Sequence, residues 1–337
     1  MEPLRIGVLG AARIAGRAIV DPARTTGARL VAVAARDRAR AETFAAEHGV
    51  ERVLDSYSDV LADPEVEAVY NPLANGLHAP WNLAAIAAGK HVLSEKPFAA
   101  DAAEAAEVRD AGRAAGVVVA DGFHYRYHPA VVRAVELVAN GTIGMLRRVD
   151  ATMTIPAPAE GDPRWSWELA GGALMDLGCY ILHAHRLLAP YAGGEPHVEK
   201  ASAGERAGSP GVDEWLDAEL VFPSGATGIA RCNMAGQSVE MSLRYEGTAG
   251  EVSLPRFVGA HQDDRVLVRA GDESREEHLG TRSSYAYQLD AFTAAVRDRA
   301  PLPTDSEDAV ATMTLVDAAY AAAGLPPRER SPRIEVS

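Results

Sequence analysis

The stretch Gly89-Lys90-His91-Val92-Leu93-Ser94-Glu95-Lys96-Pro97-Phe98 combines the end of a helix, a short buried strand and an abrupt stop. Gly89 follows an alanine-rich helical pattern, at a position where glycine commonly caps a helix. Pro97 lacks an N–H group and restricts Lys96 to an extended backbone, so the strand ends there. In an open parallel α/β sheet, ligands bind at the carboxyl ends of the strands. We therefore expect Glu95 and Lys96 at such an edge, where an ammonium group can lie beside a reacting oxygen.

A strand, a glycine turn and a helix open the chain. Residues 4–9 are mostly apolar, and the sequence GAARIAG follows at 10–16. This arrangement opens dinucleotide-binding units, in which N–H groups at the helix start hold the pyrophosphate. Gly10 supplies the tight turn, whereas Ala12 and Ala15 occupy positions that usually carry glycine. The pattern indicates a dinucleotide site, and an ordinary strand–turn–helix unit is the alternative.

The next predicted strand, residues 29–35, ends in the charged run Arg36-Asp37-Arg38-Ala39-Arg40. At this position an acidic residue binds the ribose 2′-hydroxyl of NAD, whereas arginine accommodates the 2′-phosphate of NADP. Arg36 and Arg40 are one helical turn apart and can converge on one phosphate. We interpret them as a clamp that favours NADP(H). Asp37 keeps NAD(H) possible, and a solvated helix start is the alternative without function.

Strands and helices continue to alternate up to residue 122. Strands are predicted at 66–70, 91–94 and 117–120, and helices at 79–88 and 102–115. Because the carboxyl ends of parallel strands meet at one edge, the residues that follow them can share a cleft. These residues are Leu73, Asn75, His78, Lys96, His124 and Arg126. A hydrogen bond at the start of a helix is the alternative role for His78.

The pattern changes in the second half of the chain. Residues 146–155, 217–222, 227–233 and 239–245 alternate between apolar and polar side chains, and glycine and proline turns separate these runs. Such alternation is typical of an antiparallel sheet with one covered face. The predicted fold class is therefore α/β. A Rossmann dinucleotide-binding domain (1–122) precedes an α+β domain (123–337) with a large, mostly antiparallel open sheet. Its exposed face suits pairing with a second copy of the chain.

A helix predicted at 171–186 carries three polar side chains with helical spacing. Asp176, Tyr180 and His183 fall at i, i+4 and i+7, on one face. The Tyr180 phenol can act as a general acid or base, and a neighbouring ammonium group would favour its ionised form. The alternative is that Asp176 orients the segment and that Tyr180 is merely buried. His183 and His185 do not face one another, so we expect no metal site.

The loop before this helix, residues 162–167, contains two tryptophans and an arginine. Arg164 and Trp165 are therefore candidate substrate contacts, because exposed aromatic rings suit the wall of a site for a sugar-like substrate. A packed loop between sheet and helix is the alternative.

Composition excludes several classes of protein. The formal net charge of −14 provides no general basic surface for nucleic acid or anionic lipid. The chain shows no signal-peptide pattern and no apolar run long enough to cross a bilayer. Cys179 and Cys232 are far apart in the sequence, and a disulfide between them is not expected. We expect a reduced, cytoplasmic protein without nucleic-acid or membrane partners.

Together these motifs resemble the glucose–fructose oxidoreductase/inositol dehydrogenase (Gfo/Idh/MocA) family over nearly the whole chain. The matching pieces are residues 6–12, Asn75 with His78, Glu95-Lys96-Pro97, Arg126 with Pro129, and residues 171–180. The branch with dimeric dihydrodiol dehydrogenase and NADP-dependent xylose dehydrogenase is the most similar. It likewise carries an Ala-Arg-Asp sequence with a second arginine, and a tyrosine where other branches carry histidine.

The resemblance implies an NAD(P)-dependent oxidoreductase that acts on CH–OH groups of a sugar, sugar derivative or cyclic diol. It implies a homodimer or homotetramer formed through the second sheet. It also implies that Lys96 and Tyr180 are the catalytic pair, with Asp176 positioning the tyrosine helix. Further candidate contacts to substrate or nicotinamide are His124, Arg126, Arg164, Trp165 and His183. The expected cofactor contacts are Gly10, Ala11, Ala12, Arg13, Ile14, Arg36, Arg40, Leu73, Asn75, His78, Glu95, Lys96 and Arg126.

Two alternatives stay open at this point. One is a non-catalytic regulatory protein that binds a dinucleotide or a sugar. The other is an enzyme that retains NAD(P) and uses it only transiently, as in epimerisation or glycoside cleavage. The exact substrate, the direction of hydride transfer and the strictness of the NADP preference are also open.

Overall fold

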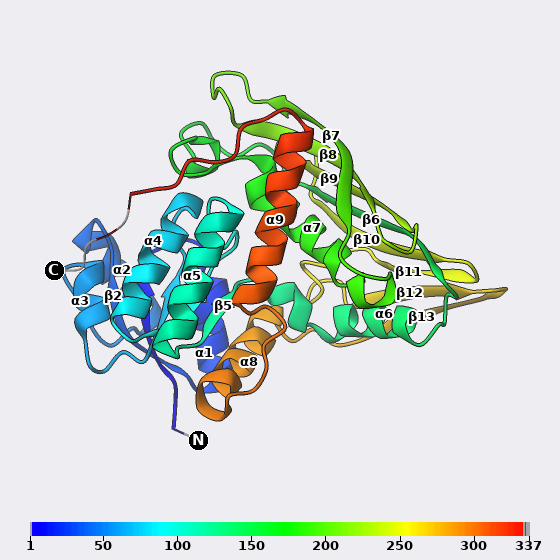
Figure 1. Ribbon diagram of the computed structural model, residues 1–337. Coiled ribbons are helices and arrows are strands. Elements are labelled where there is room, and N and C mark those ends of the chain that lie inside the picture. The colour runs from blue at the N-terminus through cyan, green and yellow to red at the C-terminus, as the bar shows by residue number, and fades with distance from the viewer. Residues whose placement is uncertain (1, 333, 335–337) are drawn as a thin grey trace. The chain divides into compact units, whose positions relative to one another are not determined.

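The computed structural model describes residues 2–332 and residue 334 (Figure 1). These residues form two compact units. The first contains the described residues of Met1–Phe123, Tyr285–Val310 and Arg330–Ser337, and the second contains His124–Ser284 and Ala311–Glu329. The continuous domains 1–122 and 123–337 stay a prediction about the protein's domain organisation.

Five parallel strands form the sheet of the first unit, in the order β2-β1-β3-β4-β5. The strands are β1 (Arg5–Leu9), β2 (Arg29–Ala34), β3 (Ala68–Asn71), β4 (His91–Ser94) and β5 (Val119–Asp121). Most of their residues are buried, as expected for a parallel sheet covered by helices on both faces. Ser94 pairs with Asn71 on one side and with Asp121 on the other. The carboxyl ends of β3, β4 and β5 are therefore aligned at one edge of the sheet.

Helical segments alternate with the strands of the first unit, and side chains cap the start of some of them. The segments are η1 (Gly16–Val20), α1 (Asp21–Thr26), α2 (Arg38–His48), α3 (Tyr57–Ala62), η2 (Asn75–Leu77), α4 (His78–Ala87), α5 (Ala102–Ala115) and α8 (Ser284–Asp298). Asp37 and Asp101 cap α2 and α5 through their carboxylates. Gly49 and Gly116 end these two helices in the left-handed conformation. Figure 1 shows α4 and α5 side by side, and α4 packs on β3 and β4.

One hydrophobic core unites the sheet with helices from distant parts of the chain. Apolar side chains of β1 to β5 pack against η1 and α1, with Val8 and Ile19 fully buried. Tyr285, Leu289 and Phe292 of α8 belong to the same core. The first unit is therefore completed by a helix that lies more than 160 residues after β5.

Eight strands form the sheet of the second unit, in the order β13-β12-β11-β10-β6-β9-β8-β7. The strands are β6 (Leu146–Thr154), β7 (His197–Glu205), β8 (Asp213–Val221), β9 (Thr227–Asn233), β10 (Glu240–Gly247), β11 (Gly250–Leu254), β12 (Arg265–Ala270) and β13 (Glu273–His278). The pair β6–β9 is parallel and every other neighbouring pair is antiparallel.

Helices cover one face of this second sheet. The helix α6 (Pro129–Ala139) packs on β11 and β12. The π-helical segment η5 (Leu174–Gly178) continues into α7 (Cys179–Arg186), which packs on β6 and β9. His185 joins α7 to the sheet, because its ring lies between the carbonyl oxygens of Ile181 and Val149. The last helix, α9 (Ser306–Ala322), completes the element order.

The predicted fold class is confirmed: a parallel Rossmann-type sheet is followed by a large, mostly antiparallel sheet. The sequence missed α3, β7 and β13. It also predicted one helix across 171–186, whereas the helical segment begins at Leu174 and is π-helical up to Gly178. Cys179 and Cys232 are both free thiols, and both are buried. In the described residues no helix has the length and apolar character needed to cross a bilayer.

Candidate active site

The turn after β1 has the conformation that a close-binding dinucleotide requires. Gly10 adopts a φ of +96° and donates its N–H to the Ala34 carbonyl at 2.8 Å. A side chain at Gly10 would press on Leu73 Cδ2, 3.0 Å from the added Cβ. Only glycine suits both the conformation and the space. The following residues, 11–14, form the turn into η1, and their contact with a cofactor stays a prediction.

The three arginines after β2 differ in their partners. Arg38 forms ion pairs with two carboxylates, those of Glu42 and Asp55. Arg40 donates to the Ala11 carbonyl at 3.1 Å, which brings its guanidinium to the glycine turn. Arg36 is exposed, and among residues 2–332 and 334 no carboxylate pairs with it.

Asp37, the acidic residue that could bind the ribose of NAD, has a structural role in the protein. Its carboxylate accepts the Ala39 N–H at 2.9 Å and so forms the N-cap of α2. One of its acceptor positions is therefore committed to the helix start.

Glu95 and Lys96 lie directly after β4, at the carboxyl edge of the sheet as predicted. The Glu95 carboxylate is buried and accepts the Tyr70 hydroxyl at 2.8 Å. Burial raises the pKa of Glu95, whereas the neighbouring Lys96 charge favours its ionised form. Lys96 is partly exposed, and its peptide bond to Pro97 is cis. The Lys96 charge thus lies near the buried Glu95 carboxylate.

Gly122 holds this edge against β5. A Cβ at Gly122 would lie 2.8 Å from the Ser94 carbonyl oxygen and 3.1 Å from Glu95 Cα. Side-chain carbons do not normally come that close to backbone atoms. The glycine therefore allows the chain after β5 to support the backbone of residues 94–96.

His78 joins two loops at the same edge. Its Nδ1 lies 2.7 Å from the Pro97 carbonyl oxygen, and its Nε2 lies 2.9 Å from the Leu73 carbonyl oxygen. The ring is buried, and burial lowers the pKa of His78 to about 4. It is therefore neutral near pH 7 and fixes the loop after β3 to the turn after β4. A hydrogen-bonding role is the alternative that the sequence left open for His78. Contacts of His78 and Asn75 with a cofactor stay predictions.

In the second unit, Tyr180 lies in a cluster of aromatic rings. Its side chain is buried in α7. The His124 ring contacts it edge-on with 6.1 Å between centroids, and the Tyr125 ring is 5.8 Å away. His124 is buried, and its Nδ1 lies 2.8 Å from the Ser284 hydroxyl. The structure therefore brings Tyr180 and His124 together.

Tyr125 was missed by the sequence analysis. Its hydroxyl lies 2.6 Å from His183 Nδ1, and both side chains are buried. The same ring packs on Phe257 at 5.1 Å. His183 therefore fixes Tyr125 beside Tyr180. The run of aromatic and basic residues at 123–128 was a visible signal, but the partner of Tyr125 depends on tertiary packing.

Asp176 and Arg164 form a pair. An Arg164 Nη1 lies 3.6 Å from Asp176 Oδ2, and the same guanidinium binds both oxygens of Asp162 at 2.9 Å. The Asp162 hydrogen bond, the larger cause, and the Asp176 charge raise the pKa of Arg164, whereas burial opposes this. The chain between Asp176 and Tyr180 is π-helical up to Gly178. Single π-helical turns are frequent at functional sites.

The expectation that both tryptophans of the 162–167 loop are exposed is wrong. Trp165 is buried, donates to the Pro158 carbonyl at 3.2 Å and lies beneath the Arg206 guanidinium. Trp167 is half-buried and contacts Arg328. Arginines cover these rings by cation–π stacking, so this loop follows the packed alternative.

Arg126 is half-buried in the short helix η3 (His124–Tyr127). Burial raises the pKa of the nearby Tyr245, and the Arg126 charge opposes this rise. Among the described residues no ion pair joins Arg126 to a carboxylate, so its guanidinium suits an external anion or hydroxyl.

The residues offer a definite set of chemical groups. The first unit presents a tight glycine turn, two arginines without carboxylate partners in the described chain, and an ammonium group beside a carboxylate. The second unit presents a phenol, an imidazole and a carboxylate around one helix. Guanidinium groups bind phosphate, and a phenol exchanges protons with a hydroxyl or carbonyl oxygen.

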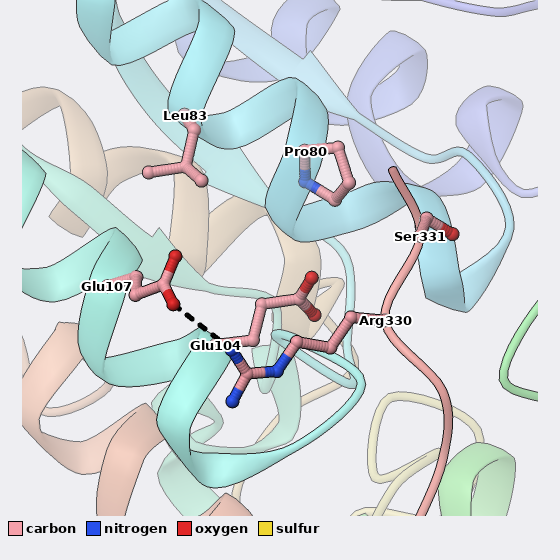
Figure 2. A pocket seen from close by; sticks show the side chains of 6 residues that line it. All are labelled: Pro80, Leu83, Glu104, Glu107, Arg330 and Ser331. Carbon is pink, nitrogen blue, oxygen red and sulfur yellow. Dashed lines mark hydrogen bonds and ion pairs between the residues drawn. The ribbon is translucent and has the colours of Figure 1, made fainter. Parts of the chain in front are cut away.

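A separate surface pocket of about 190 Å³ belongs to the first unit (Figure 2). Pro80, Leu83, Glu104, Glu107, Arg330 and Ser331 line it. Figure 2 shows the Arg330 guanidinium directed at Glu107. Its Nη1 donates to Glu107 Oε1 at 3.0 Å. None of the predicted site residues lines it, so it is distinct from the candidate active site.

Comparison with known proteins identifies the family. A model described as an oxidoreductase family with an NAD-binding Rossmann fold matches residues 4–123, and the GFO/IDH/MocA C-terminal domain matches residues 131–253. The chain is 34% identical over 324 residues to D-xylose 1-dehydrogenase (NADP(+)) 2 of Haloferax volcanii, covering 95% of this chain and 97% of that protein. It is 34% identical over 230 residues to trans-1,2-dihydrobenzene-1,2-diol dehydrogenase of Sus scrofa, covering 67% and 65%. The predicted branch is therefore confirmed.

A solved structure is similar along most of its length. The 3-ketoreductase from Actinomadura kijaniata, in complex with NADP and TDP-benzene, has a TM-score of 0.88 at 29% identity. The match covers 95% of this chain and 98% of that chain. Solved variants of that reductase replace a lysine by alanine or glutamate, or a tyrosine by phenylalanine. The chain belongs to the Gfo/Idh/MocA family of NAD(P)-dependent oxidoreductases.

Proposed function

We propose that the protein is an NADP(H)-dependent oxidoreductase. It transfers a hydride between the nicotinamide and a CH–OH or C=O carbon of a sugar, sugar derivative or cyclic diol. The observation that carries the proposal is the glycine turn after β1, on which the Arg40 guanidinium is anchored at 3.1 Å. The named substrates and cofactors of the xylose dehydrogenase, the dihydrodiol dehydrogenase and the 3-ketoreductase support the same class.

The residues present fit NADP(H) better than NAD(H). In this proposal the backbone of the Gly10 turn holds the pyrophosphate, with contacts from Ala11, Ala12, Arg13 and Ile14. The Arg36 guanidinium is exposed, and no carboxylate in the described chain pairs with it. Asp37, the acid at the position that can bind a ribose hydroxyl, already caps α2 with one carboxylate oxygen. Arg36 and Arg40 therefore hold the 2′-phosphate in this proposal.

Lys96 and Tyr180 are the proposed catalytic pair. When bound, NADP(H) supplies or accepts the hydride. Tyr180 takes the hydroxyl proton during oxidation and donates it during reduction. The Lys96 ammonium favours the phenolate and hydrogen-bonds the reacting oxygen. Lys96 belongs to the first unit and Tyr180 to the second, so their pairing is part of the proposal. The lysine and tyrosine variants solved for the 3-ketoreductase change the same residue types.

The remaining candidates divide into contacts and supports. We assign substrate or nicotinamide contacts to His124 and Arg126, since His124 touches the Tyr180 ring and Arg126 has no carboxylate partner in the described chain. Arg164 is bound to Asp162 and Asp176 and acts through Asp176. Trp165 donates to the Pro158 carbonyl, and His183 is hydrogen-bonded to Tyr125. We therefore assign both residues a structural role in supporting the site.

The proposal extends to assembly and location. We infer a homodimer or homotetramer through the face of the eight-stranded sheet that α6 and α7 leave open, in the cytoplasm. Trp215 of β8 is 37% exposed, whereas its neighbour Leu216 is buried. Light scattering after gel filtration tests the assembly, since each chain contributes 35.6 kDa.

The test is a titration followed by a substrate panel. Tryptophan fluorescence is recorded while NADPH or NADH is added, and the preferred cofactor is then assayed at 340 nm with sugars, keto sugars and cyclic diols. The proposal expects tighter NADPH binding and net turnover with at least one substrate. Equal binding would contradict the arginine clamp. Nucleotide retained through purification without net turnover would favour transient use of the cofactor instead.

A further inference from the structure

A buried ion pair joins β8 to the segment after α9. Asp213 begins β8 and Arg328 follows α9, and both side chains are fully buried. Each nitrogen of the Arg328 guanidinium has an acceptor in the second unit. Nε donates to the Gly171 carbonyl at 2.7 Å, Nη1 donates to the Gly211 carbonyl at 2.9 Å, and Nη2 donates to Asp213 Oδ1.

Aromatic rings complete this surrounding. The Arg328 guanidinium stacks on Tyr320 at 4.3 Å and on Trp167 at 4.8 Å. The Tyr320 hydroxyl also donates to Asp213 Oδ1 at 2.9 Å. A buried charge persists only when it is paired and fully hydrogen-bonded, and here both partners meet that condition. The pair therefore has a fixed geometry.

The second oxygen of Asp213 reaches the helix of Tyr180. Asp213 Oδ2 accepts the Leu174 N–H at 2.6 Å. Leu174 is the first residue of η5, where N–H groups lack partners within the helix. A negative charge at this end is also favourable for the helix dipole. Tyr180 follows six residues later, in the same continuous helical segment.

One glycine before this helix is explained by the same contacts. Gly172 has a φ of +134°, and a Cβ there would overlap Asp213 Oδ1 and press on the Arg328 guanidinium. Gly172 thus allows the ion pair to lie against the backbone that enters the Tyr180 helix. A Cβ at Gly171 would instead lie 2.8 Å from the Ser166 carbonyl oxygen, so Gly171 allows the preceding loop to pack on this backbone.

We propose that Arg328 is a positioning residue for Tyr180: through Asp213 and the Gly171 carbonyl it fixes the start of the helix that carries the tyrosine. The proposal rests on the proposed function, in which Tyr180 exchanges the substrate proton. A displacement of about 1 Å of a reacting group can cost about a hundredfold in rate. Arg328 acts on Tyr180 through Asp213 and the backbone at the start of the helix.

The experiment compares Arg328→Met with Arg330→Met in the full-length protein. Arg330 lies two residues later in the same segment but pairs with Asp101, the N-cap of α5, and with Glu107 of α5. Both variants therefore lose a guanidinium group, but from different surroundings. We expect Arg328→Met to lower kcat roughly tenfold to a hundredfold. Its Kd for NADPH should stay within about twofold, because the glycine turn and the proposed 2′-phosphate clamp are in the first unit. Arg330→Met should keep kcat within about twofold.

Two further readouts separate positioning from a general loss of structure. In the Tyr180→Phe background, Arg328→Met should lower the residual kcat no further, because its effect acts through the missing phenol. Hydrogen exchange should speed up at the amide of Leu174 in Arg328→Met but not in Arg330→Met. Arg328→Lys keeps the charge without the three directed donors, should rescue kcat in part, and carries the same comparisons if the methionine variant does not fold.

The outcomes discriminate the two proposals. Wild-type kcat in a folded Arg328→Met, or an equal further loss in the Tyr180→Phe background, would overturn the positioning role while leaving the proposed function intact. Wild-type kcat in Tyr180→Phe itself would overturn the proposed function and the positioning role together. A loss of kcat in Arg328→Met that disappears in the Tyr180→Phe background, with faster exchange at Leu174, would support both.

Discussion

At the scale of single residues, the four charged residues that follow β2 make different contacts. Asp37 caps a helix, Arg38 pairs with carboxylates, Arg40 binds the backbone of the glycine turn, and Arg36 is exposed. Identical side chains thus differ in function because of what surrounds them.

This division predicts the effect of removing individual arginines. Arg36→Ala with Arg40→Ala should weaken NADPH binding by roughly ten- to a hundredfold, the worth of one or two charge-assisted hydrogen bonds. NADH binding should change little, because NADH lacks the 2′-phosphate. Arg38→Ala is the matched control and should alter neither affinity. Fluorescence titration of the three proteins with both nucleotides measures this, and an equal loss for NADH and NADPH would refute the clamp.

Gly122 gives a second prediction at this scale. Gly122→Ala should destabilise the protein by roughly 1–3 kcal/mol, because the new methyl overlaps the Ser94 carbonyl and displaces Glu95 and Lys96. Turnover should fall although no polar group is lost. Gly116→Ala is the control, since a Cβ there meets nothing within 4 Å, and it should only strain the cap of α5. Urea unfolding and kcat are measured for both, and equal losses of kcat would contradict the account.

Sequence reasoning placed backbone positions better than side-chain partners. It located Glu95 and Lys96 at a strand end, because proline and glycine punctuate the chain locally. It did not find that Arg164 is bound by carboxylates or that Tyr125 binds His183. Such pairings depend on which distant residues the fold brings together, and no local pattern encodes them.

At the scale of elements, the N-terminus of α5 contains a carboxyl group with an unusual titration. Glu104 accepts the Ala100 N–H at 2.8 Å and lines the pocket of Figure 2. Burial raises the pKa of Glu104 to about 7. The native state therefore binds a proton more tightly than the unfolded chain, and this group's contribution to stability falls as the pH rises from about 4.5 to about 7.

Glu104→Gln should remove that dependence. The amide keeps a neutral acceptor for the Ala100 N–H. The free energy of unfolding of the variant, relative to that of the wild type, should therefore rise by roughly 1–3 kcal/mol from pH 5 to pH 8. Urea unfolding at both pH values gives the difference. A stability difference between the two proteins that is the same at pH 5 and pH 8 would show that Glu104 is not the titrating group.

The strands that sequence reasoning missed, β7 and β13, are the two edges of the eight-stranded sheet. β13 (ESREEH) is almost wholly charged or polar and exposed, so it lacks the apolar alternation that marks a half-buried strand. Charged edges prevent pairing with other chains, which explains this composition. Strands in the middle of the sheet, such as β9 at 227–233, were predicted at their observed bounds because one face is buried.

At the scale of the whole molecule, the first unit is assembled from distant parts of the sequence. The core of the five-stranded sheet includes Leu289 and Phe292, both almost fully buried. Both residues belong to α8, which lies within the range 123–337 that the sequence predicts as the second domain. Which core a helix joins depends on tertiary packing, and no local pattern encodes it.

This arrangement predicts how fragments behave. Residues 1–123 alone should fail to unfold cooperatively, because they expose the apolar surface that α8 covers. Joining residues 285–310 to them through a flexible glycine–serine linker should restore a cooperative transition. Circular dichroism during heating distinguishes the two fragments, and a sharp transition in residues 1–123 alone would show that they form an independent domain.

The central claim is that Tyr180 and Lys96 perform the chemistry of an NADP(H)-dependent oxidoreductase. The most direct test measures kcat and the Kd for NADPH on the same preparations of wild type, Tyr180→Phe and Lys96→Ala. The account predicts that kcat falls by about two to four decades in each variant while NADPH still binds. Turnover close to wild type in both variants, with binding intact, would contradict it.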